Sequence, residues 1–83
     1  MATDKQVNDY AVLFTRKFYI DMKHKPSYRG TNFSWDKFPN IVAKLCRASL
    51  FMNFSEDEQP TEQQKQLAAD TSRKTAQLLL EDK

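Results

Sequence analysis

The positions of glycine and proline constrain the fold of this chain more than any other feature. Its 83 residues contain one glycine and three prolines, at Gly30, Pro26, Pro39 and Pro60. Proline breaks the interior of a helix but is tolerated in its first turn, so long segments free of both residues favour continuous helices. The sequence therefore predicts a small all-α protein: one domain over residues 1–83, built from three helices.

The first helix is predicted over about residues 4–22, with Thr3 or Asp4 as its cap. One of its faces is expected to enter the core, and consists of Val7, Tyr10, Ala11, Phe14, Phe18 and Met22. Four apolar residues lie off this face: Val12, Leu13, Tyr19 and Ile20. A helix that is apolar on several sides is either central to the fold or keeps a face for another chain. The sequence leaves both readings open.

The second helix is predicted over about residues 36–53, since Ser34 can cap its start and Pro39 fits a first turn. Its expected core face consists of Phe38, Ile41, Val42, Leu45, Ala48, Ser49 and Met52. Leu50 is expected at the back of this helix, exposed or against another element. Cys46 lies at the edge of the expected core face.

The third helix is predicted over about residues 61–80, because Thr61 and Gln64 form a capping-box pattern directly after Pro60. Its packing face is mostly small: Ala68, Ser72, Thr75, Ala76 and Leu79. Small residues bury little area per turn, so this helix is expected either to depend on its neighbours or to project.

Positive charge and aromatic rings gather between Arg16 and Arg47. This segment holds eight lysine and arginine residues against two aspartates, a net charge of +6, whereas residues 48–83 carry −3. A long loop rich in basic and aromatic residues is predicted at its centre, over residues 23–35, between the first two helices. This uneven distribution of charge, rather than the total of +2, indicates a binding surface.

The residue types present argue against catalysis and against bound cofactors. The single glycine rules out phosphate-binding and dinucleotide-binding loops, and one cysteine with one histidine cannot build a zinc site. Cys46 and His24 are better explained as a core-edge residue and a turn residue than as a nucleophilic pair. We therefore expect a protein that is not an enzyme and has no metal, cofactor or small-molecule substrate.

The start of the chain is polar, no apolar run is long enough to cross a membrane, and a single cysteine fits a reducing compartment. These features predict a cytoplasmic protein without membrane contact. Short chains of this kind are common among the accessory subunits and inhibitors encoded by phages and mobile elements, and we expect that class here.

The expected function is binding to a protein, either a different partner or a second copy of the chain. Aromatic residues and arginine are the usual anchors of such interfaces. The expected binding residues are Lys23, Lys25, Tyr28, Arg29, Phe33, Trp35, Lys37, Lys44 and Arg47, with Tyr19 and Ile20 as a second patch. The alternative is binding to DNA or RNA through residues 23–47, where lysines would neutralise phosphates and rings would stack on bases. Whether Phe33 and Trp35 are exposed or buried is left open.

Overall fold

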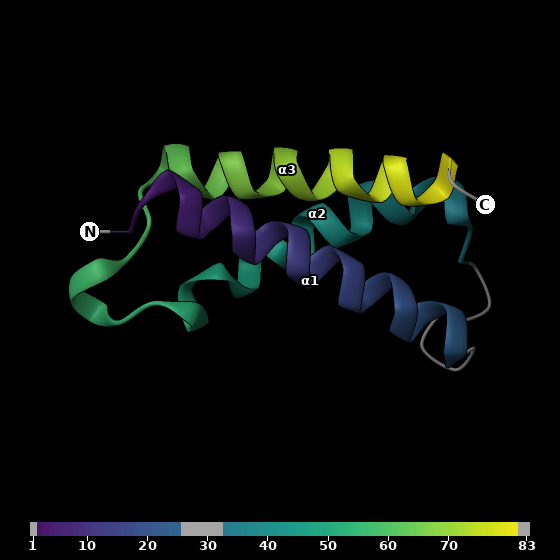
Figure 1. The fold of residues 1–83 in the computed structure, drawn as a ribbon, viewed down its shortest axis with the longest axis horizontal. Coiled ribbons are helices and arrows are strands. Elements are labelled where there is room, and N and C mark those ends of the chain that lie inside the picture. Colours follow the sequence, from purple (N-terminus) through teal and green to yellow (C-terminus); the bar gives the residue numbers. More distant parts are fainter. Residues whose placement is uncertain (1, 26–32, 82–83) are drawn as a thin grey trace.

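The computed structural model describes residues 2–25 and 33–81, and within these ranges it is helical without strands (Figure 1). The three main helices are α1 (Asp4–His24), α2 (Phe38–Ser49) and α3 (Glu62–Glu81). Short 3-10 helices flank α2 and precede α3: η2 (Trp35–Lys37), η3 (Leu50–Asn53) and η4 (Glu56–Glu58). The predicted all-α class with three helices is confirmed.

The predicted caps form at the starts of α1 and α3. Thr3 and Gln6 make a reciprocal capping box, and Thr61 and Gln64 do the same at α3, with 2.9 and 3.1 Å hydrogen bonds in each. These bonds satisfy backbone N–H groups that have no partner within the helix.

The connection between α1 and α2 is shorter than the loop predicted over residues 23–35. The last turn of α1 includes Lys23 and His24, and basic side chains at this end suit the helix dipole. The next element begins at Trp35, where the Ser34 hydroxyl accepts a hydrogen bond from the backbone N–H of Asp36. Residues 26–32 lie outside the described part of the chain.

The central helix is α3, which the sequence did not indicate. Both α1 and α2 make most of their interhelical contacts with α3 and few with each other. In Figure 1, α1 and α3 run in the same direction, α2 runs in the opposite direction, and α1 diverges from α3 toward its C-terminal end. The buried residues of α3 are Gln64, Ala68, Ala69, Ser72 and Ala76. All of these except Gln64 are small, so the backbones of α1 and α2 can both come close to α3. The face that was expected to pack weakly therefore contacts both other helices.

One buried polar side chain from each helix meets at this centre. The hydroxyls of Thr15 (α1) and Ser72 (α3) lie 2.5 Å apart. The third residue is Cys46 of α2, and all three side chains are fully buried. The Cys46 thiol also lies 4.0 Å from the carbonyl oxygen of Ala68. Burial raises the pKa of Cys46 from 9.0 to about 11, and a hydrogen bond with Ser72 opposes part of that rise.

The orientation of α2 corrects the predicted core face. The residues that it buries are Phe38, Pro39, Val42, Ala43 and Cys46, followed by Leu50 at the start of η3. At 100° per residue, this face lies about a quarter turn from the one that the apolar pattern indicated. Ala43 and Cys46 are small enough to pack on the small residues of α3, and this close contact sets the rotation of the helix. As a result Leu50 is fully buried, whereas Leu45 and Met52 are exposed.

Candidate functional site

A row of stacked aromatic rings fills the space between α1 and α2. Successive ring centroids of Tyr10, Phe14, Phe18 and Phe38 lie 5.7, 6.0 and 6.1 Å apart, with interplanar angles of 27°, 11° and 17°. The Tyr10 hydroxyl is 2.8 Å from the hydroxyl of Ser49 on α2. Phe38 is buried, but the three rings that come from α1 are only half-buried. The rings thus lie between the two helices, and the three from α1 remain partly exposed at the surface.

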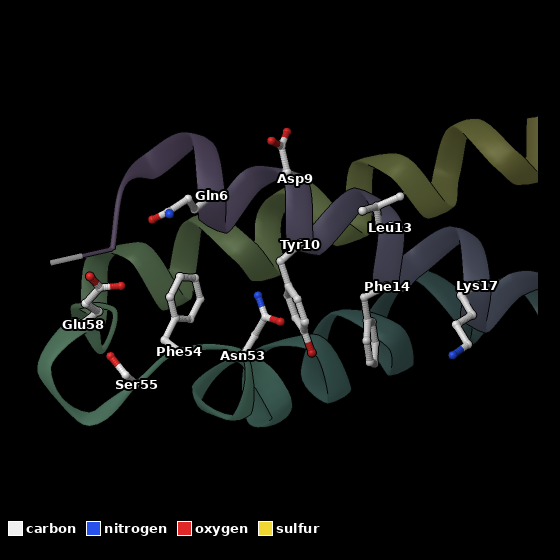
Figure 2. Close-up of a pocket in the computed structure, with 10 residues that line it drawn as sticks. All are labelled: Gln6, Asp9, Tyr10, Leu13, Phe14, Lys17, Asn53, Phe54, Ser55 and Glu58. Carbon is white, nitrogen blue, oxygen red and sulfur yellow. The ribbon is translucent and has the colours of Figure 1, made fainter.

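A groove opens where this row meets the segment between α2 and α3. Its volume is about 650 Å³. The lining residues are Gln6, Asp9, Tyr10, Leu13, Phe14 and Lys17 of α1, with Asn53, Phe54, Ser55 and Glu58 opposite. Figure 2 shows Tyr10 and Phe14 pointing from α1 toward α2, whereas Phe54 lies to one side of them, across from Gln6, with Asn53 between Phe54 and Tyr10. Three aromatic rings therefore line the groove, and its rim carries Glu58 at one end, Lys17 at the other and Asp9 between them.

Large aliphatic side chains flank the aromatic row on both helices. On α1, Leu13 is 66% exposed and Ile20 is 53% exposed. On α2, Leu45 is seven residues after Phe38 and four before Ser49, both of which contact α1, so it lies on the α2 face that turns toward α1. These exposed apolar side chains beside the groove make this side of the molecule a candidate interaction surface.

A second candidate surface is an aromatic cluster at the other end of α1, formed by Tyr19, Phe33, Trp35 and Phe38. The Trp35 ring meets the rings of Phe33, Tyr19 and Phe38 at centroid distances of 5.1, 5.6 and 5.3 Å, all close to edge-on. The Lys23 ammonium lies 5.3 Å from the centre of the Tyr19 ring. Trp35 and Phe33 are half-buried, which answers the question that the sequence left open.

The predicted binding residues fall on separate parts of the surface. The structure brings Tyr19, Lys23, Phe33 and Trp35 together, and Lys25 and Lys37 are exposed on the segments that flank them. Ile20 instead lies with Leu13 among the exposed aliphatic side chains that flank the aromatic row. Tyr28 and Arg29 lie outside the described residues.

Lys44 and Arg47 lie on another side of α2, facing the start of α3. Arg47 donates hydrogen bonds to Gln66 (3.0 Å) and to the Glu62 carboxylate (3.1 Å), and this carboxylate has its pKa lowered mainly by its contact with Lys65. Lys44 and Arg47 line a shallow hollow of about 440 Å³ together with Ala48, Phe51, Glu62 and Lys65. Part of the predicted positive charge is therefore neutralised within the fold.

The sequence did not predict the groove, because its two walls come from α1 and from residues 53–58, which are far apart in the chain. Leu13 and Ile20 gave a signal, since their spacing of seven marks a second stripe on α1. Leu45, which is exposed beside the aromatic row, was predicted as a core residue, and nothing in the sequence indicates that Phe54 lies near α1.

Cys46, the one residue considered as a nucleophile, is poorly placed for that role. The Cys46 thiol is buried and its raised pKa keeps it protonated at neutral pH, so it is a poor nucleophile. No cluster of three metal-binding side chains occurs in residues 2–25 and 33–81, and no helix in these ranges is long and apolar enough to cross a membrane. No protein-family model, curated protein or solved structure matches this chain.

Proposed function

We propose that this protein is a non-enzymatic binding protein that regulates, inhibits or assists a larger cytoplasmic protein assembly through its aromatic cluster. The partner surface would be acidic and would cover Trp35 and Phe33, with contacts to the lysines around them.

The state of Trp35 carries this proposal. Its ring is held edge-on by three other rings, so little conformational freedom remains to be lost on binding, yet part of it stays exposed to solvent. Partly exposed, well-supported tryptophans are frequent anchors of protein interfaces. Exposed lysines at positions 23, 25 and 37 would attract an acidic partner and speed its association.

Affinity capture from a cell lysate tests the proposal, with the folded protein as bait. The informative variant is Lys37→Glu, because this lysine is exposed and its reversal leaves the core intact. The matched control is Lys74→Glu, which makes the same charge change at an exposed position of α3. We expect a partner that is retained by the wild type and by Lys74→Glu and is lost with Lys37→Glu. Equal retention by all three baits would contradict the use of this surface.

Binding to DNA or RNA is the second candidate, and one observation favours it. Lys44, Arg47 and Lys65 surround a hollow whose wall includes the exposed ring of Phe51, a combination suited to a phosphate and a stacked base. A labelled mixed-sequence oligonucleotide tests this. Binding that falls steeply with salt and weakens in the double variant Lys44→Ala, Arg47→Ala would support it, and no binding at low salt would exclude it.

A further inference from the structure

One ridge of α1 carries a charge pattern that is complementary to itself. Lys5, Asp9, Leu13, Lys17 and Asp21 follow one another at intervals of four residues, so they form a continuous row along the helix surface. Leu13 is at the centre of this row. Each charge on one side of it has the opposite charge at the same distance on the other side.

This pattern fits two copies of α1 that pack antiparallel around a two-fold axis at Leu13. Such an axis places Asp9 opposite Lys17 of the second copy, and Lys17 opposite its Asp9, because a two-fold interface repeats every contact. Lys5 and Asp21 repeat the match one turn farther out. Rows of residues four apart are also the rows that interdigitate in the commonest class of helix packing in globular proteins.

The two inner charges of the row, Asp9 and Lys17, are accessible for this contact. Asp9 and Lys17 are both exposed, and both lie on the rim of the groove. Asp9 does have an intramolecular neighbour, Lys5, at 3.0 Å. That pair is exposed, and such pairs add little net stability, so a second lysine can share the carboxylate.

Apolar side chains supply the rest of the contact. Leu13, which is 66% exposed, meets its counterpart at the axis. Ile20, which is 53% exposed, falls opposite Gln6 of the second copy, at the part of the groove where Phe54 forms the far wall. The groove of about 650 Å³ has room for such a side chain beside the aromatic rings that line it.

We infer that a second copy of this chain covers the groove, and that the protein is a two-fold dimer joined by antiparallel α1 helices. Self-association through Leu13 is independent of the proposed function, because it leaves the ring of Trp35 uncovered. The dimer would present two aromatic clusters at once, and two linked sites bind a repetitive partner more tightly than one.

Sedimentation equilibrium of the full chain tests this inference. The wild type is expected to dimerise, and Asp9→Lys alone or Lys17→Asp alone should each weaken the dimer by about tenfold or more, because like charges then face each other twice. The double variant Asp9→Lys, Lys17→Asp should restore the wild-type dissociation constant to within about threefold. Loss of the intramolecular Lys5–Asp9 pair would not be rescued in this way, so the restoration reports on contact between copies.

Leu13→Asp tests the contact at the two-fold axis, and Leu78→Asp is its matched control. Both leucines are exposed to the same extent, 66% and 65%, but Leu78 is on α3. Leu13→Asp should give a monomer with an unchanged circular dichroism spectrum, whereas Leu78→Asp should remain dimeric. The inference is overturned if the wild type is monomeric at millimolar concentration, if the double variant stays monomeric, or if Leu78→Asp disrupts the dimer equally.

Discussion

The two interfaces inside this protein are built in opposite ways. Along α3, small residues such as Ala68, Ser72 and Ala76 let both other helices approach closely, and the side chains there are almost completely buried. Between α1 and α2, large rings hold the helices apart and keep part of their own surface exposed. The first interface holds the fold together, and the second leaves apolar surface for other molecules. Four experiments test this division.

Removal of the ring that anchors the aromatic row should have the largest effect. Phe38→Ala is expected to reduce the free energy of unfolding by about 3–5 kcal/mol, since this ring is fully buried and touches Phe18, Tyr19 and Trp35. Urea denaturation measures the change. The same deletion at Phe51, which is 55% exposed, should cost less than about 0.5 kcal/mol. Equal losses would mean that the row adds no stability beyond that of an exposed ring.

The pH dependence of the unfolding free energy tests how completely the interface with α3 buries Cys46. Because burial raises the pKa of Cys46 to about 11 in the folded protein, against 9.0 ordinarily, the unfolded chain loses this proton first. The stabilisation that this difference in pKa gives to the folded protein is fully present below pH 9. It is lost as the pH rises from 9 to 11, and the total loss in unfolding free energy is about 3 kcal/mol at most. The measurement is the difference in unfolding free energy between wild type and Cys46→Ala across this range. A difference that does not change with pH would show that the thiol is accessible to water.

The hydroxyl pair between α1 and α3 should have a smaller effect that depends on both partners. Thr15→Val and Ser72→Ala are each expected to cost about 1–3 kcal/mol, because each leaves a buried polar group with fewer partners. The double variant should cost clearly less than the sum of the two. A thermal double-mutant cycle gives the coupling. Thr71→Val, at an exposed hydrogen bond to Asn8, serves as the control and should be close to neutral. Strict additivity would mean that the two hydroxyls do not interact.

The smallest effect is expected for the one hydrogen bond of the aromatic row. Tyr10→Phe removes the bond to the Ser49 hydroxyl but keeps the ring, and Ser49 retains its bond to the carbonyl oxygen of Cys46. The expected loss is about 0.5–1.5 kcal/mol, measured by urea denaturation. A loss as large as that of Phe38→Ala would mean that this bond, rather than ring packing, joins α1 to α2.

The contrast between the interfaces also explains which parts of the fold the sequence could predict. The inward face of α1 was predicted correctly at Val7, Ala11 and Met22, since long helices with regular apolar spacing give a strong signal. The rotation of α2 about its axis was predicted wrongly. Leu45 and Leu50 are equally apolar, so hydropathy does not show which of the two faces the core. Which of them is buried depends on how closely Ala43 and Cys46 approach α3, and that depends on side-chain volume across the interface rather than on hydropathy.

The candidate sites were predictable to a different extent. Phe33 and Trp35 were named as candidate binding residues because unusual residues and charge gather within one short segment, but Tyr19 was assigned to a separate patch with Ile20 and Phe38 to the core. The separation of Arg47 from that cluster was not foreseen, because its partners Glu62 and Gln66 are distant in sequence. The groove beside Leu13 depends on Phe54, whose position follows from the path of the connection between α2 and α3.

The chain contains one tryptophan and one cysteine, and they lie in different interfaces. Trp35 belongs to the aromatic cluster, whereas Cys46 is enclosed against Ala68 and Ser72. Fluorescence emission and thiol labelling thus provide two natural reporters that need no engineered probe. If both signals change at the same denaturant concentration, the molecule opens as one cooperative unit; if fluorescence changes first, the exposed rings loosen while the helical centre is still closed.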